Sequence, residues 1–195
     1  MLLAAGSARR MQGRDKLLEA IDGEPILTRL ARTLMAAGVD QALAVVRPDD
    51  GARRAALAGT GLGIVENPRA AEGMGGSLAR GVAALPMGVD AALIALADMP
   101  DLEADDLARL IAAFDPGEGR EIVRAAAQDG TPGHPVLFGR RFFEPLASLG
   151  GDEGARRVLA APRDYVVEVR LPGRRAITDL DTPEAWASWR AARAG

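Results

Sequence analysis

Four basic side chains lie within the first sixteen residues, directly behind a short apolar segment. They are Arg9, Arg10, Arg14 and Lys16. Gly6 precedes them and Gly13 lies among them, and glycine lets a backbone approach an anion without a Cβ in the way. The N–H groups of such a turn, together with guanidinium and ammonium groups, bind polyphosphate. The alternative is an amino-terminal tail with scattered surface charge.

The spacing of these glycines excludes two common phosphate-binding motifs. A Walker A motif requires G-x-x-x-x-G-K-[ST]. Here Gly6 and Gly13 are seven positions apart, and Arg14 follows the second glycine. The segment does not match the dinucleotide pattern G-x-G-x-x-G either.

A second glycine-rich segment covers residues 67–78. Its glycines remove side chains where a flat nucleobase could lie against the main chain. They are Gly73, Gly75 and Gly76, and we expect them to form a loop. Ser77 is a suitable N-cap for a helix over 77–85. A plain loop that ends in this cap is the alternative.

Asp98 ends the most apolar run of the chain, residues 90–97, and Pro100 then forces a turn. A carboxylate at the end of a parallel strand lies at the edge where α/β sheets bind ligands. Mg²⁺ prefers oxygen ligands and usually takes one or two protein carboxylates. Asp98 is therefore a candidate metal ligand, and a turn or capping role is the alternative.

Asp179 and Asp181 precede a helix start in which Thr182 is the expected N-cap and Pro183 the first helical residue. On the residues alone, this segment is a helix start in which a capping role is expected.

His134 is the only histidine, and the chain has no cysteine, so a zinc site is not expected. Gly133 and Pro135 beside it indicate a shaped loop near a ligand. The segment from Gly151 to Arg156 is typical of a turn into a helix N-terminus, which can bind an anion. A salt bridge between Asp152 and Arg156 is the alternative.

Strand-like and helix-like segments alternate along the chain. Strands are expected over 1–4, 17–21, 41–46, 62–66, 90–97, 121–126, 134–138 and 165–171. Helices are expected over 25–38, 50–57, 77–85, 102–114, 140–148, 153–159 and 183–194. This alternation predicts one α/β domain over 1–195, with a mainly parallel sheet between two layers of helices. Ligands then bind at the carboxyl ends of the strands.

The composition narrows the possible partners. The chain has 24 basic and 27 acidic residues, so its net charge of −3 implies no general affinity for nucleic acid or anionic membranes. No apolar run is long enough to span a bilayer, and no signal peptide is visible. The absence of cysteine fits a reducing compartment, and a cytoplasmic location is expected.

The sequence LAAGSARRMQGRDKLL resembles the L-A-A-G-x-S-x-R-M-G-(x)n-K signature of the MobA-like nucleotidyltransferases. It is most similar to their molybdenum cofactor cytidylyltransferase branch. The matching residues are Leu3, Ala4, Ala5, Gly6, Arg10, Met11 and Lys16. Ala8 and Gln12 replace the family's serine and glycine. The LAAG form is associated with CTP and LAGG with guanylyl transfer, so Ala5 favours cytosine.

Four later segments carry the same resemblance in the family's order. ENPRAAEGMGGSL is similar to N-P-x-x-x-x-G-M-S-S-S-L, with glycines in place of two serines. ADMP is similar to the metal-binding G-D-M-P, and TDLDTPEA to D-I-D-T-P-E-D. The stretch from GHPVLF to GDEGAR matches a further family pattern.

The resemblance implies a Rossmann-like fold of the nucleotide-diphospho-sugar transferase type. It also implies transfer of CMP from CTP to the terminal phosphate of molybdenum-bound molybdopterin, with release of pyrophosphate and a requirement for Mg²⁺. Alternatives that remain open are GTP or ATP as donor, another small phosphate as acceptor, and a non-catalytic protein. The last would pass nucleotide or cofactor to a molybdenum hydroxylase or its chaperone.

The resemblance also assigns roles to residues. Catalysis is assigned to Arg10, Lys16 and Asp98, and the metal to Asp98 and Asp181 with Asp179 in reserve. The nucleotide is assigned to Leu3, Ala4, Ala5, Gly6, Arg10, Lys16, Asn67, Gly73 and Ser77. The acceptor is assigned to His134, Asp152 and Arg156.

Overall fold

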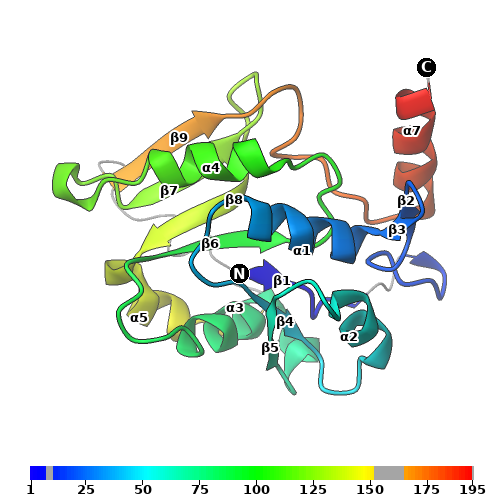
Figure 1. The fold of residues 1–195 in the computed structure, drawn as a ribbon, viewed down its shortest axis with the longest axis horizontal. Coiled ribbons are helices and arrows are strands. Elements are labelled where there is room, and N and C mark those ends of the chain that lie inside the picture. Colours follow the sequence, from blue (N-terminus) through cyan, green and yellow to red (C-terminus); the bar gives the residue numbers. More distant parts are fainter. Residues whose placement is uncertain (8–10, 152–164, 195) are drawn as a thin grey trace.

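The computed structural model describes residues 1–7, 11–151 and 165–194. A seven-stranded sheet forms its centre, in the order β5-β4-β1-β6-β8-β7-β9 (Figure 1). The strands are β1 (Leu2–Leu3), β4 (Leu43–Val46), β5 (Gly63–Glu66), β6 (Ala91–Leu96), β7 (Ile122–Ala126), β8 (Pro132–Gly139) and β9 (Val166–Arg170). Of these seven strands, β8 alone runs antiparallel to its neighbours. The predicted mainly parallel α/β sheet is confirmed.

The short strand β1 lies in the middle of the sheet. Leu2 is paired with Ala44 of β4 on one side and with Ala95 of β6 on the other. Both neighbours run parallel to β1, so the carboxyl ends of all three strands meet at one edge of the sheet.

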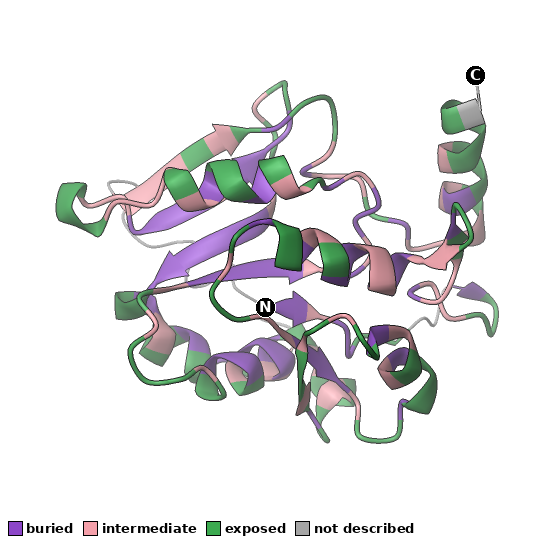
Figure 2. Cartoon of the chain, in the orientation of Figure 1, coloured by how far each residue is buried: buried purple, intermediate pink, exposed green. Residues whose placement is uncertain are grey.

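Side chains alternate between the two faces of the sheet, as the pleat of a strand requires. Along β6, Leu93 and Ala95 belong to one buried apolar cluster and Ile94 to the other. Helices α1 (Ile26–Ala36) and α4 (Ala104–Ala112) pack in the first cluster, while α3 (Met74–Ala83) and α5 (Phe143–Ala147) pack in the second. The sheet is thus covered on both faces. Its inner strands are mostly buried, whereas the edge strands β5 and β9 are exposed or half-buried (Figure 2).

A small hairpin extends beyond the sheet. Strands β2 (Ala20–Ile21) and β3 (Glu24–Pro25) are joined by Asp22 and Gly23, with φ of 53° and 85°. Two positive φ angles are typical of a type I′ turn, whose twist suits a hairpin. Asp22 and Gly23 therefore form the turn of this hairpin.

The carboxy-terminal helix α7 (Pro183–Ala194) lies beside this hairpin (Figure 1). Trp186 is buried, and Arg190 donates a hydrogen bond of 3.0 Å to Glu19. The Oγ1 of Thr182 accepts a hydrogen bond of 3.2 Å from the backbone N–H of Ala185. Thr182 is therefore the N-cap and Pro183 the first helical residue, as predicted.

The remaining elements are short. Helix α2 (Gly51–Leu57) follows β4, and single 3₁₀ turns are formed by η2 (Ala70–Glu72), η3 (Pro116–Glu118) and η4 (Arg140–Phe142). The helix predicted over 153–159 lies outside the described residues. No helix in the described part of the chain is both long enough and apolar enough to cross a bilayer.

The prediction for the second glycine segment was wrong in one respect. Helix α3 begins at Met74, so Gly75 and Gly76 form its first turn and are not a loop. A Cβ on Gly75 would lie 2.8 Å from the carbonyl oxygen of Gly150. Gly75 therefore lets α3 approach the backbone after α5, and Ser77 lies inside the helix and does not cap it.

Candidate functional site

A cavity of about 400 Å³ lies where β1 and β6 end. Three parts of the chain line it, namely the amino-terminal loop, the segment around η2 and α3, and the acidic residues after β6 and before α7. The lining residues are Leu3, Ala5, Gly6, Ser7, Lys16, Leu17, Ala70, Ala71, Gly73, Met74, Ser77, Leu96, Ala97, Asp98, Asp179 and Asp181. This edge of the sheet is where the parallel topology predicts a ligand.

Lys16 lies at the centre of the charged side of this cavity. Its ammonium group donates hydrogen bonds to Asp98 Oδ2 and Asp181 Oδ1. The side chains of Lys16 and Asp98 are only 14% and 13% exposed. Burial alone would lower the pKa of Lys16, but the charges and hydrogen bonds of Asp98 and Asp181 outweigh burial and raise it. Lys16 is therefore a fixed cation.

A backbone contact brings the two acidic segments together. The N–H of Leu180 donates a hydrogen bond of 3.2 Å to the carbonyl oxygen of Asp98. Burial, followed by the nearby charges of Asp181 and Asp98, raises the pKa of Asp179. Three carboxylates thus gather around one ammonium group, and their mutual repulsion is only partly offset by it.

The arrangement fits a divalent cation. Asp98 Oδ1 is buried and has no hydrogen-bond partner in the described part of the chain. A buried carboxylate oxygen without a partner is costly, so it is available to a ligand. Within the described residues, however, no three His, Cys, Asp or Glu side chains converge as a metal site from protein groups alone. A metal here would take part of its coordination from substrate and water, as Mg²⁺ usually does.

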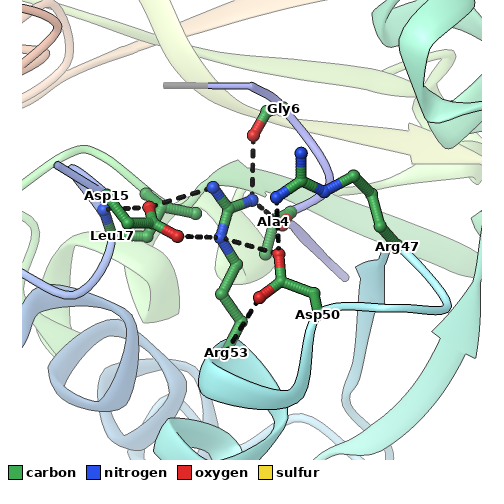
Figure 3. A network of polar contacts seen from close by, with 7 residues as sticks. All are labelled: Ala4, Gly6, Asp15, Leu17, Arg47, Asp50 and Arg53. Carbon is green, nitrogen blue, oxygen red and sulfur yellow. Dashed lines mark hydrogen bonds and ion pairs between the residues drawn. The ribbon is translucent and has the colours of Figure 1, made fainter. Parts of the chain in front are cut away.

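The amino-terminal loop is held from behind by one buried arginine. Arg53 of α2 donates to the carbonyl oxygens of Ala4 (2.6 Å) and Gly6 (2.9 Å) and to both carboxylate oxygens of Asp15 (Figure 3). The side chain of Arg53 is 1% exposed. Asp50, which caps α2 and pairs with Arg47, also contacts Arg53.

The second segment supplies an apolar and backbone-rich wall. Ala70, Gly73 and Met74 line the cavity together with Ser77. Asn67 does not line it but donates from Nδ2 to Ser77 Oγ at 3.0 Å. Asn67 therefore supports Ser77 from behind.

His134 lies in β8, outside the cavity lining. Burial, followed by the positive charge of Arg124, lowers its pKa, and the negative charge of Asp98 opposes this effect. Its Nδ1 is buried, with no hydrogen-bond partner in the described residues. Gly133 beside it is needed for a close approach, since a Cβ there would clash with the carbonyl oxygen of Ala176.

Nine of the twelve described residues assigned from the sequence line the cavity, whereas Ala4, Asn67 and His134 do not. Three of the assigned residues, Arg10, Asp152 and Arg156, lie outside the described part of the chain. Arg53 was missed because no local pattern separates it from its neighbour Arg54. Arg54 pairs with Glu66 at the surface, whereas Arg53 points inward.

Comparison with known proteins places this chain in a family. Residues 1–167 match the model of the MobA-like NTP transferase domain. The chain is 32% identical to the purine catabolism protein PucB of Bacillus subtilis (strain 168), over 95% of this chain and 92% of that protein. It is also 32% identical to the molybdenum cofactor guanylyltransferase of Cereibacter sphaeroides, over 94% of this chain and 91% of that protein.

A solved crystal structure also matches this chain over most of its length. Rv0371c from Mycobacterium tuberculosis H37Rv, crystallised in complex with manganese, superposes with a TM-score of 0.75 at 28% identity. The match covers 96% of this chain and 94% of that chain. The chain therefore belongs to the MobA-like NTP transferase family and is a nucleotidyltransferase of that family.

Proposed function

We propose that this protein transfers CMP from CTP to the terminal phosphate of molybdenum-bound molybdopterin and releases pyrophosphate. The observation that carries the proposal is the cavity in which Lys16 faces Asp98 and Asp181 beneath a glycine-containing loop. Cations and backbone N–H groups bind a triphosphate there, and the carboxylates bind the metal that accompanies it.

The chain's own groups would act by positioning and by charge. The backbone at Gly6 and Ser7, with the ammonium of Lys16, holds the triphosphate. An oxygen of the acceptor phosphate attacks the α-phosphorus of CTP, and the bond from that phosphorus to the oxygen that bridges the α- and β-phosphates breaks. The leaving group departs with the bonding electron pair, so no covalent enzyme intermediate is needed.

Asp98 and Asp181 would hold a divalent cation, and Asp179 lies close enough to contribute to the charge of the site. The manganese complex of the relative Rv0371c supports a divalent metal in this family. When bound, the cation offsets negative charge on the phosphates as pyrophosphate leaves. We propose Mg²⁺ as the physiological ion.

The choice of base rests on the amino-terminal loop. Ala5 lines the cavity, and the LAAG sequence around it resembles the cytidylyltransferase branch. The wall formed by Ala70, Gly73 and Met74 presents backbone and small or apolar groups to the base. GTP is the second candidate donor, because a molybdenum cofactor guanylyltransferase is 32% identical over most of the chain.

Pyrophosphate release tests the proposal. The purified protein is incubated with molybdenum-bound molybdopterin, Mg²⁺ and each of CTP, GTP, ATP and UTP. The proposal expects release with CTP well above the other three, together with a cytosine dinucleotide product identified by mass spectrometry. Pyrophosphate release with GTP alone would support the second candidate, GTP as the donor. Release with none of the four nucleotides would refute both candidates.

A further inference from the structure

We propose that Arg53 is the positioning residue of the amino-terminal loop. Its single guanidinium ties the start of the loop, at Ala4 and Gly6, to the end of the loop at Asp15. It thereby fixes Lys16 opposite the carboxylates. The inference rests on the proposed function in so far as this loop is taken to hold a nucleoside triphosphate.

The geometry uses the planar fork of arginine. Nη1 donates to Ala4 O and Gly6 O, while Nε and Nη2 donate to the two oxygens of Asp15 at 2.7 and 2.9 Å. Four hydrogen bonds therefore join loop residues that are up to eleven positions apart in the sequence. A lysine at this position would keep the charge, but its point-like ammonium cannot reach both ends of the loop in one plane.

The contact at Asp15 extends to Lys16 and Leu17. Asp15 Oδ1 also accepts a hydrogen bond of 3.0 Å from the backbone N–H of Leu17. Leu17 is buried, and its carbonyl oxygen accepts a bond of 3.1 Å from the N–H of Leu27 in α1. Both neighbours of Lys16 in the sequence are thus fixed, so the backbone from which its side chain reaches the cavity is fixed as well.

Arg53 acts through these residues, because it does not line the cavity. Its buried charge is balanced on two sides, by Asp15 in the loop and by Asp50 at the start of α2 (Figure 3). In the described part of the chain, Asp50 forms its hydrogen bonds and ion pairs with Arg47, Arg53 and Arg54, none of which lines the cavity. The two aspartates therefore form a matched pair, of which only Asp15 belongs to the loop.

The test compares Asp15→Asn with Asp50→Asn, and adds Arg53→Lys. Each aspartate variant removes one negative charge from the same buried guanidinium, so both are expected to lower the melting temperature. Three quantities are measured in the full chain. They are the melting temperature, amide hydrogen exchange at residues 4–7 and 11–17, and the kcat and nucleotide KM for pyrophosphate release.

The proposal expects Asp15→Asn and Asp50→Asn to differ in nucleotide KM and in hydrogen exchange of the loop. In Asp15→Asn and Arg53→Lys, binding of the nucleotide must itself order the loop. If the fraction of protein whose loop is ordered for binding falls to one tenth, nucleotide KM rises about tenfold while kcat changes less. Exchange at the loop amides accelerates in the same variants. Asp50→Asn is expected to keep wild-type KM and wild-type loop exchange.

Two outcomes would overturn the proposal. In one, all three variants lose stability but keep wild-type KM and wild-type loop exchange. In the other, Asp50→Asn raises KM and accelerates loop exchange as much as Asp15→Asn does. If the wild-type protein releases no pyrophosphate, the proposed function fails by itself, and the hydrogen exchange of the same variants still decides the role of Arg53.

Discussion

The ammonium of Lys16 contacts the carboxylate of Asp98, although the two residues are 82 positions apart in the sequence. The contact joins the loop after β1 to the end of β6, two strands that are neighbours in the sheet. Asp181, from the segment before α7, contacts the same ammonium. The ammonium and its two carboxylate partners therefore lie together in the cavity at the carboxyl ends of β1 and β6.

Replacing Lys16 by methionine is expected to destabilise the protein and to increase its response to metal. The change leaves the carboxylates of Asp98 (13% exposed) and Asp181 (35% exposed) without their cation, and the exposure of Asp181 keeps the cost to about 2–3 kcal/mol. That corresponds to a fall in melting temperature of about 5–10 °C. Mg²⁺ or Mn²⁺ should then raise the melting temperature of Lys16→Met more than that of the wild type.

Scanning fluorimetry with and without metal checks this prediction, and Arg32→Met is the control. Arg32 pairs with Glu24 at the surface, where an ion pair contributes little. Because the pKa of Lys16 is raised, the stabilisation from its charge is fully present at pH values below its ordinary 10.5 and is lost as the pH rises from there through the raised value. Equal metal responses in Lys16→Met and wild type would contradict a shared site.

Asp98→Asn is expected to abolish most turnover while the fold is kept. The amide is nearly isosteric but cannot supply a negative charge to a metal, so kcat should fall by about 100-fold or more. Steady-state pyrophosphate release gives kcat, and circular dichroism reports the fold. Asp105→Asn, at an exposed position in the first turn of α4, is the control and should retain activity. Normal turnover in Asp98→Asn would show that the metal assignment is wrong.

Asp179→Asn is expected to stabilise the protein in the absence of metal. Burial and the charges of Asp181 and Asp98 raise the pKa of Asp179, so its ionisation opposes folding increasingly as the pH rises above the ordinary value of 3.8. The exposed side chain limits the gain to less than about 1 kcal/mol, or about 1–3 °C.

Melting curves at about pH 4.5 and about pH 7 check the sign, since the difference between variant and wild type should widen at the higher pH. Asp40→Asn, at an exposed position before β4, should show no such widening. A lower melting temperature for Asp179→Asn at neutral pH would mean that its carboxylate is stabilising, contrary to the electrostatics described above.

The helices and strands could largely be predicted from the sequence, whereas the tertiary contacts between them could not. The apolar run over 90–97 predicts a buried strand from local rules, and β6 lies within it. Asp98 could be placed at the ligand-binding edge because the apolar run over 90–97 ends immediately before it. These features depend on neighbours in the sequence alone.

Arg53 and Gly75 depend on tertiary contacts and could not be interpreted in this way. Arg53 is buried only because α2 returns against the loop after β1. Gly75 is required by the backbone of Gly150, far along the chain, and not by a loop conformation of its own. From the sequence pattern alone, such glycines are assigned to a loop, because glycine disfavours a helix.

The two glycines in the first turn of α3 should respond oppositely to alanine. Gly76 has room, because its Cβ would lie 3.8 Å from Asn67 Nδ2, an ordinary contact. Gly76→Ala should stabilise the helix by about 0.5–1 kcal/mol, the difference in helix propensity. Gly75→Ala should destabilise the protein by about 1–3 kcal/mol, because the new methyl group meets the carbonyl oxygens of Gly150 and Gly151 at 2.8 and 2.9 Å. Urea unfolding of both variants against wild type measures the difference, and a stabilising Gly75→Ala would show that α3 does not need this close approach.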